Sequence, residues 1–229
     1  MRTQLQRLIE TIQPLDGESI EAAKQRLDSL TKPPGSLGRL EQIACQLSGI
    51  TGQLAPDITK KAVIVIAADH GVCAEGISAF PQEVTAQMVM NFVNGGAAVN
   101  VLARQAGADV FCIDAGVASD LPDHPGLISK KVKYGTDNIT QGPAMAENEA
   151  VEAIFAGADQ VKQLVNKGYR VVATGDMGIG NTTASSAILA AMTHFPVEEV
   201  TGLGTGIAPE RLKHKQDVIE RAIRANRPD

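Results

Sequence analysis

The run Ala62-Val-Ile-Val-Ile-Ala-Ala68, followed directly by Asp69-His70-Gly71, decides the fold predicted for this chain of 229 residues. A continuous apolar run of this length is typical of a strand that is buried on both faces, as strands are in parallel sheets. Two further runs resemble it, at 108–114 and 170–174, and a weaker one covers 199–201. Helices are predicted at 84–105, 146–167, 182–194 and 209–225. This alternation implies βαβ crossovers, so we expect an α/β fold: a parallel, Rossmann-like sheet with helices on both faces.

Residues 1–50 have a different pattern, because their apolar residues recur at helical spacing. One stripe contains Ile20, Ala23, Leu27 and Leu30, and a second contains Leu37, Leu40, Ile43 and Leu47. Between the stripes, residues 31–36 include two consecutive prolines, which fix φ and remove two backbone donors. We expect helices that are interrupted at this segment.

The composition excludes several classes of protein. With 44% hydrophobic and 21% charged residues, 22 Gly and 11 Pro, the chain is close to average globular usage, which disfavours disorder, collagen and disulfide scaffolds. The net charge of -5 argues against broad capture of nucleic acid or of an anionic membrane, although a local basic pocket for one phosphate stays compatible with it. Aromatic residues make up only 3%, too few for a surface that stacks bases.

The cysteines and the amino terminus bear on location. Cys45, Cys73 and Cys112 are odd in number and form no CxxC, which predicts reduced, packed thiols. The first residues lack the apolar region of a signal peptide, and no stretch approaches the ~18 apolar residues of a membrane span. We expect a cytoplasmic protein with neither membrane nor nucleic acid as a partner.

The candidate binding loops follow the predicted strands, where open parallel sheets bind their ligands. They are rich in glycine or acid, and they comprise 69–78, 114–116, 174–183 and 201–206. Glycine lets a ligand approach the backbone, and a helix start offers free N–H groups to an anion. Gly178, Gly180, Asn181 and Thr182 precede an Ala/Ser-rich helix and fit that use. The alternative is a tight βα turn with a good N-cap.

Known nucleotide patterns match poorly. There is no GxxxxGK[ST], and residues 175–180 spell GxxGxG rather than GxGxxG. Glu198 and Glu199 lie at roughly the distance of a ribose-binding acid, so dinucleotide binding is the weaker alternative. Thr205, Gly206 and Lys215 are instead candidates for holding a single phosphate, with Lys215 as a point charge. The alternative for Lys215 is a solvated lysine beside Lys213.

Two acidic positions are candidates for chemistry. Asp176 follows a strand inside a glycine loop, where it either contacts a ligand or caps a backbone N–H. Asp69-His70 suggests acid/base or metal chemistry, or a structural hydrogen bond. No second His or Cys stands at ligand spacing, so we expect no metal site. No chemistry is assigned to His124, His194 or His214.

Five motifs then occur in order along the chain: Lys32-Pro-Pro-Gly-Ser-Leu-Gly-Arg-Leu-Glu41, Ala68-Asp-His-Gly-Val72, Pro81-Gln-Glu-Val-Thr85, Gly175-Asp-Met-Gly-Ile-Gly-Asn-Thr-Thr183 and Gly202-Leu-Gly-Thr-Gly206. Together they closely resemble the nicotinate-nucleotide–dimethylbenzimidazole phosphoribosyltransferase family, which builds the lower-ligand nucleotide of cobalamin. The resemblance implies transfer of 5-phosphoribosyl from nicotinate mononucleotide to 5,6-dimethylbenzimidazole, giving α-ribazole 5′-phosphate and nicotinate. It implies a homodimer, and neither a metal nor another cofactor.

The resemblance also implies roles for individual residues. Asp176 stands at an acidic position beside the ribose and base, where many family members have Glu. The nucleotide site would be lined by Gly178, Asn181 and Thr182. The phosphate would be held by Gly204, Thr205, Gly206 and Lys215. The benzimidazole would be faced by Ser78, Phe80, Met88 and Met177, of which Phe80 and Met88 replace polar residues of some relatives.

One departure concerns the general base that takes the benzimidazole N–H proton. The family pattern continues beyond residue 229 and includes a Gly-Glu-Gly segment whose Glu is the expected base. We therefore expect an amino-terminal portion: residues 1–55 as the helical segment of a small domain, and 56–229 as an α/β nucleotide-binding domain that is incomplete at its C-terminal end. Such a chain would lack the base, and a non-catalytic nucleotide-binding or scaffold fragment is the alternative function.

Overall fold

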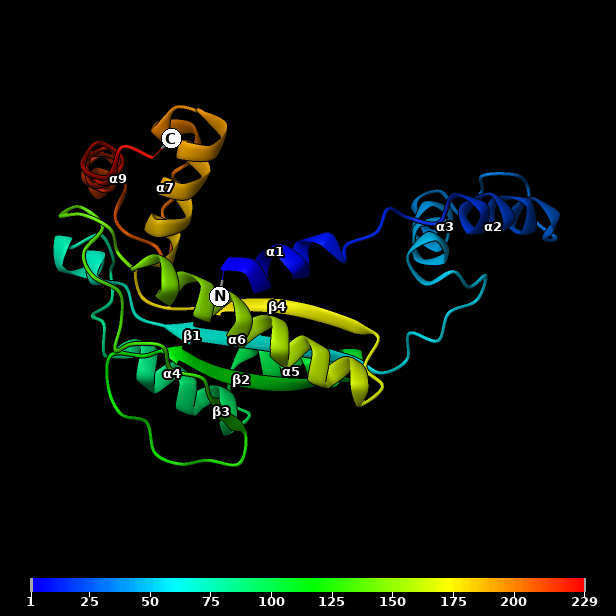
Figure 1. The fold of residues 1–229 in the computed structure, drawn as a ribbon, viewed down its shortest axis with the longest axis horizontal. Helices are drawn as coiled ribbons and strands as arrows, with labels where there is room; N and C mark the ends of the chain where they lie inside the picture. The colour runs from blue at the N-terminus through cyan, green and yellow to red at the C-terminus, as the bar shows by residue number, and fades with distance from the viewer. Residues whose placement is uncertain (1, 229) are drawn as a thin grey trace. The chain divides into compact units, whose positions relative to one another are not determined.

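The computed structural model describes residues 2–228, and the chain forms two compact units that meet between Thr59 and Lys60 (Figure 1). The first unit contains helices α1 (Arg2–Glu10), α2 (Gly17–Ser29) and α3 (Arg39–Thr51). Residues 11–16 separate α1 from α2, because Pro14 lacks an N–H and Asp16 caps α2 by accepting from the backbone of Glu18 and Ser19.

The predicted interruption between the two apolar stripes is present in the first unit. Residues 30–38 are not helical. An ion pair of 2.8 Å between Lys32 and Glu41 spans this connection, and both side chains are largely buried. The Ser48 hydroxyl donates to the Ser19 carbonyl oxygen across the α2–α3 interface. The double proline therefore ends one helix, and the ion pair fixes the path to the next.

The second unit contains a four-stranded, wholly parallel sheet in the order β3-β2-β1-β4. Its strands are β1 (Lys61–Ala68), β2 (Ala108–Gly116), β3 (Leu127–Ser129) and β4 (Val171–Met177). The opening apolar run forms β1, which lies in the interior of the sheet. β4 lies at one edge, where Ala173 and Thr174 are exposed.

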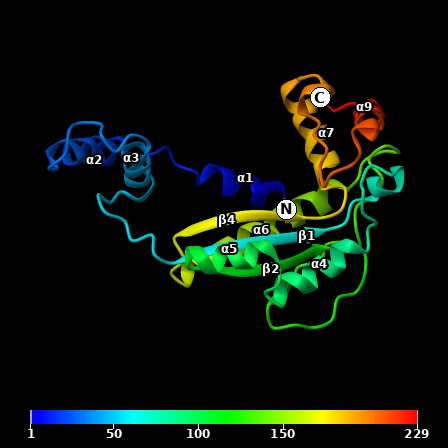
Figure 2. The same ribbon diagram turned by 180° about the vertical axis from the view of Figure 1, so that it is seen from behind.

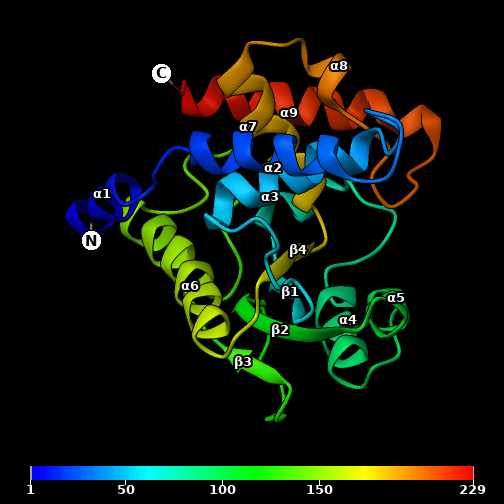
Figure 3. The ribbon, with the colours of Figure 1, turned by 90° about the vertical axis from the view of Figure 1, so that its right-hand side faces the viewer.

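Helices cover both faces of the sheet, so the predicted α/β fold is confirmed. On one face, Val65 and Ala67 pack with α4 (Val84–Val93) and the start of α5 (Ala98–Ala106). On the other face, Ala62 and Ile64 pack with Leu164 of α6 (Glu147–Asn166). Figure 3 shows α6 on one side of the strands and α4 and α5 on the other. The alternation of side chains along β1 therefore supplies both cores.

Three local predictions differ from the structure. The helix expected at 84–105 is two helices, because Gly95 has φ +77° and Asn100 holds the connection by bonding Ala97 N–H and the Phe92 carbonyl. The strand expected at 199–201 is wrong, since α8 (Val197–Val200) begins after Pro196. β3 was missed because its three residues carry no pattern.

The C-terminal part of the second unit is helical and packs on itself. It contains α7 (Asn181–Thr193), a short 3₁₀ helix η2 (Pro209–Arg211) and α9 (Leu212–Asn226). Ala187 and Ala190 of α7 pack against Val197 and against Ile219 of α9. Figure 2 shows α7 and α9 together beyond one end of the strands. Small residues on α7 thus allow α9 to approach closely.

The α6 core gives a stability prediction. Leu164 is fully buried against Ala62 and Ile64, so Leu164→Ala should lower the free energy of unfolding by about 2–5 kcal/mol through lost transfer energy and a cavity. Urea unfolding followed by circular dichroism measures this. The matched control is Val165→Ala, whose side chain is 45% exposed and should cost less than about 1 kcal/mol. Equal costs for the two variants would contradict the assigned core.

Candidate functional site

The loops after β1 and β4 emerge together at the carboxyl ends of these strands, because the two strands are parallel and Ala67 pairs with Met177. A pocket forms there between these loops, the 203–205 loop and α9. It is lined by Ile77, Ser78, Gly178, Ile179, Gly180, Asn181, Thr182, Leu203, Gly204, Thr205 and Lys215. The structure thus brings together Ser78 and most of the residues that were predicted to hold the nucleotide and its phosphate.

The amino terminus of α7 faces this pocket without a side-chain cap. Its N-cap is Gly180, with φ +95°, and no side chain in the described part of the chain caps the helix. Gly178 is fixed by a close approach, because a Cβ there would lie 1.9 Å from the Ala68 carbonyl oxygen. The loop therefore admits only glycine at 178. At the start of the 13-residue helix, the N–H groups of Asn181 and Thr183 donate to the carbonyl oxygens of Gly178 and Gly180, so the Thr182 N–H is the one that remains for an anion at this helix start, among the described residues.

Lys215 is the charged group of the pocket. Its side chain is 1% exposed, and Nζ donates to Thr182 Oγ1 at 2.8 Å and to the Gly202 carbonyl oxygen at 3.1 Å. The alternative of a solvated lysine is therefore wrong for Lys215, whereas Lys213 is exposed and pairs with Glu198 and Asp217.

The positive charge of Lys215 has no counter-ion among the hydrogen-bond partners that the structure gives it. Burial lowers the pKa of its ammonium group, and no carboxylate among residues 2–228 opposes that shift. Both hydrogen-bond partners, Thr182 and Gly202, are neutral. A buried ammonium whose partners in the described chain are neutral is costly unless an anion joins it. An anion beside Lys215 would therefore offset this cost.

The space enclosed by the pocket is small. It measures about 20 Å³, which is room for about one water molecule. The 202–206 loop that closes it is exposed, and a Cβ on Gly204 would lie 3.2 Å from Lys215 Nζ. A phosphate group would therefore enter only if this loop moved outward.

Asp69 and His70 lie next to the loops and contact their backbone. Asp69 is buried, and its Oδ2 accepts the Ala118 N–H at 2.8 Å, which is a structural hydrogen bond. A Cβ on Gly178 would lie 3.1 Å from the His70 ring. Burial lowers the pKa of His70, while the nearby carboxylates of Asp176 and Asp69 oppose that shift. His70 is thus a neutral ring beneath the glycine loop, close to the Asp176 charge.

The remaining predicted residues do not line the pocket. Asp176 is exposed near the end of β4, and Phe80 is 48% exposed. Met88 and Met177 are partly buried against the core between the sheet and α4. Gly206 lies in the same loop as Gly204 but outside the pocket.

Sequence reasoning missed some residues that shape the site. Ile77, Ile179 and Leu203 provide its apolar walls. The Thr85 hydroxyl is fully buried and accepts the Ile179 N–H at 3.1 Å, so α4 holds the centre of the glycine loop. Thr85 lies in the Pro81–Thr85 motif, which was the one available signal, although no role was assigned to it.

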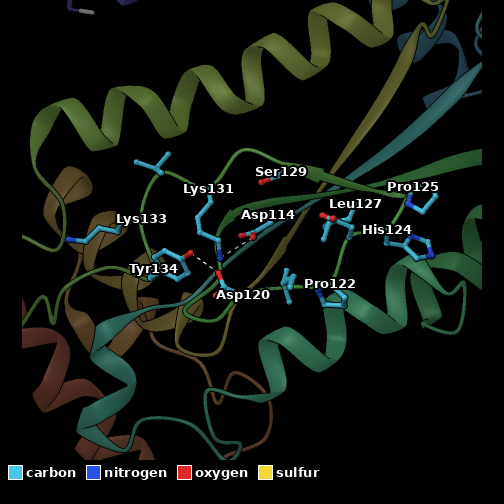
Figure 4. Close-up of a pocket in the computed structure, with 13 residues that line it drawn as sticks. Asp114, Asp120, Pro122, His124, Pro125, Leu127, Ser129, Lys131, Lys133 and Tyr134 are labelled. Carbon is cyan, nitrogen blue, oxygen red and sulfur yellow. Dashed lines mark hydrogen bonds and ion pairs between the residues drawn. The ribbon is translucent and has the colours of Figure 1, made fainter.

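A larger pocket, of about 660 Å³, lies beside β2 and β3 (Figure 4). Several of its polar groups contact one another: Lys131 forms a 3.0 Å ion pair with Asp114 and lies over the ring of Tyr134, whose hydroxyl donates to Asp120. Of the candidate binding loops, only 114–116 contributes to it, through Asp114. These contacts fix the path of the chain on either side of β3.

The described residues offer neither a metal site nor a membrane-spanning helix. Between residues 2 and 228, no cluster of three His, Cys, Asp or Glu side chains is placed to hold a metal ion. None of the described helices has the length and apolar character needed to cross a membrane. The three cysteines are free thiols, and burial raises the pKa of Cys112 to about 11, which makes that thiol unreactive.

Comparison with known proteins shows extensive similarity. A relative from Chloroflexus aggregans, named nicotinate-nucleotide–dimethylbenzimidazole phosphoribosyltransferase, is 53% identical over 98% of this chain and 64% of its own length. A relative of the same name from Desulforamulus reducens is 56% identical over 99% of this chain and 65% of its own. The chain thus spans less than two thirds of the length of these relatives.

A solved structure agrees with the sequence comparison. The crystal structure of CobT from Thermus thermophilus superposes with a TM-score of 0.87 at 49% identity, covering 90% of this chain and 62% of that one. The family DBI_PRT, described as phosphoribosyltransferase, matches residues 12–229. On this evidence, the chain belongs to the DBI_PRT phosphoribosyltransferase family.

Proposed function

We propose that this chain carries the nucleotide-binding part of an enzyme that moves 5-phosphoribosyl from nicotinate mononucleotide to 5,6-dimethylbenzimidazole. The products are α-ribazole 5′-phosphate and nicotinate. The observation that carries the proposal is Lys215, a buried ammonium with neutral partners, placed at the uncapped amino terminus of α7. The names of the relatives support the choice of substrates.

The phosphate of the nucleotide would occupy the position between Lys215 and α7. Thr182 accepts from Lys215 in the free protein, and a phosphate oxygen would take over that hydrogen bond. The backbone N–H groups of Thr182, Gly204 and Thr205 would complete its coordination. Binding therefore replaces neutral acceptors by a charged one.

The ribose would then extend along the Gly178–Gly180 loop toward Asp176. Breaking the bond to nicotinate develops positive charge at the anomeric carbon, and a carboxylate beside it stabilises that charge. Asp176 is the residue that we assign to this role. Attack by the benzimidazole nitrogen from the opposite face inverts the configuration, and the departing pyridine needs no proton.

The benzimidazole would face Ser78, Phe80, Met88 and Met177. Because Phe80 is exposed and the methionines pack on the core behind the pocket, this side is the less complete part of the site. The benzimidazole must also lose its N–H proton to a general base. The 229 residues contain no Gly-Glu-Gly segment, so we assign the proton acceptor to a part of the protein other than these residues.

Two accompanying properties belong to the same proposal. We place the protein in the cytoplasm, because its three cysteines are free thiols, which fits a reducing compartment. We also propose a homodimer that uses the exposed face of α7. Ile188, Leu189 and Met192 are 57%, 47% and 78% exposed there, and two-fold symmetric dimers are the commonest oligomers.

The Lys215 assignment gives a binding prediction. Lys215→Ala should weaken nicotinate mononucleotide binding by about 1–3 kcal/mol, or roughly 5- to 150-fold, through loss of one charge-assisted contact. Isothermal titration calorimetry measures this, with Lys213→Ala as the matched control. Affinity for the parent chain should also fall as the pH rises through the lowered pKa of Lys215, because only the ammonium form binds. Equal affinities for the two variants would remove the assignment.

The proton-acceptor assignment gives a turnover prediction. These residues should bind nicotinate mononucleotide but transfer its phosphoribosyl group about 10²–10⁴-fold more slowly than the Chloroflexus aggregans relative, because a general base is absent. The assay follows α-ribazole 5′-phosphate by chromatography for both proteins. Comparable turnover would place the base within residues 1–229, and Asp176→Asn would then be the first variant to test. Binding without any turnover would favour the non-catalytic function.

The dimer gives a prediction about assembly. Sedimentation at micromolar concentration should show a dimer, and Met192→Glu should shift it to monomer by placing a charge in the apolar contact. Leu102→Glu is the control, because Leu102 is 68% exposed on α5, away from α7. A monomeric parent chain, or equal effects of the two substitutions, would reject this interface.

A further inference from the structure

Three segments that are distant in the sequence meet next to the proposed phosphate pocket. They are the 71–78 segment with its 3₁₀ helix η1 (Gly71–Glu75), the 138–140 loop and α9. Glu75 joins all three. One carboxylate oxygen accepts from Arg221 of α9 at 2.6 Å, and the other accepts from Asn138 at 2.7 Å and Thr140 at 3.0 Å.

Backbone contacts reinforce this junction on the pocket side. The Glu75 carbonyl oxygen accepts from His214 Nε2 at 2.7 Å, and the Gly76 carbonyl oxygen accepts from Arg211 at 2.6 Å. His214 directly precedes Lys215. The contacts therefore hold the beginning of α9 at the residue next to the phosphate-binding lysine.

An apolar cluster lies beneath the polar contacts and joins the same three segments. It consists of Val72, Ile77, Val218 and Ile139. Val218 is fully buried and follows Lys215 by three residues, so both side chains lie on the same face of α9. Ile77 and Ser78 line the pocket opposite that face. The distance between Lys215 and the 77–78 wall is thus set by this junction.

Glu75 is suited to hold the junction as a charged group. Its side chain is 19% exposed, against 47% for Arg221. The hydrogen bond from Arg221, with those from Asn138 and Thr140, holds the pKa of the Glu75 carboxyl below its usual range. A partly buried carboxylate that accepts several hydrogen bonds orders its donors more strongly than a surface ion pair does.

We propose that Glu75 is a positioning residue for phosphate binding: it fixes α9 so that the Lys215 ammonium points at the amino terminus of α7. It touches no substrate, and its carboxylate acts through Arg221, while its backbone carbonyl oxygen accepts from His214. This inference rests on the proposed function, since Lys215 must be the phosphate ligand for the placement to matter in binding. The fixing of α9 itself is independent of which ligand is bound.

The test is a double-mutant cycle on the 229-residue chain. Nicotinate mononucleotide is titrated calorimetrically into the parent chain, Glu75→Gln, Lys215→Ala and the double variant. Glu75→Gln keeps the shape of the side chain but removes its charge, and it should weaken binding about tenfold in the parent. It should have no further effect in the Lys215→Ala background. Glu220→Gln is the matched control, because it removes an ion pair with Arg224 that stays within α9, and its affinity should equal that of the parent.

Amide hydrogen exchange of the ligand-free proteins supplies an independent measurement. Glu75→Gln should speed exchange at residues 214–216 at least fivefold while leaving the buried Ala187 of α7 unchanged. Equal weakening by Glu75→Gln with and without Lys215, or unchanged exchange at 214–216, would overturn the proposal. If the parent chain binds no nicotinate mononucleotide, the proposed function fails, and the exchange comparison alone then decides whether Glu75 positions α9.

Discussion

The parallel pairing of β1 with β4 is the constraint on which the site depends. It brings the Asp69-His70-Gly71 turn and the Gly178–Gly180 loop together at the carboxyl ends of the two strands. There the Ala68 carbonyl oxygen approaches Gly178 so closely that no Cβ fits. Because the loop is held this tightly, α7 begins directly after it, with Gly180 as its N-cap and Asn181 as its first residue. The burial of β1 between two sets of helices supplies the rigidity that this geometry requires.

Two lysines of the second unit, Lys131 and Lys215, differ in how their charge is balanced. Lys131 is paired with Asp114 and covered by the Tyr134 ring, so its charge is neutralised within the protein. Lys215 is more deeply buried and has neutral partners. Desolvating an ammonium without a counter-ion is unfavourable, and a fold tolerates that cost where a ligand supplies the missing charge. Lys131 thus has a structural role, whereas the environment of Lys215 supports the binding role proposed for it.

Most of the fold followed from local pattern, and its failures have identifiable physical causes. The Ala62–Ala68 run was decisive because an interior strand of a parallel sheet must be apolar on both faces. The strand expected at 199–201 is wrong because α8 begins after Pro196, and a helix of four residues is too short to show an apolar period in the sequence. Within the site, glycine spacing and Lys215 were visible in the sequence. Thr85 and Glu75 were not assigned, because their roles depend on partners 94 and up to 146 residues away.

The position of β4 at the edge of the sheet has a consequence for Asp176. One side of β4 pairs with β1, and its other side presents backbone donors and acceptors that an additional strand can bond. Strand addition there would enclose the Asp176 carboxylate, which is now open to solvent, in a medium of lower dielectric constant. Its electrostatic effect on a neighbouring cationic centre would then strengthen severalfold. The electrostatic effect of Asp176 thus depends on whether a strand pairs with the free side of β4, as well as on the identity of the residue.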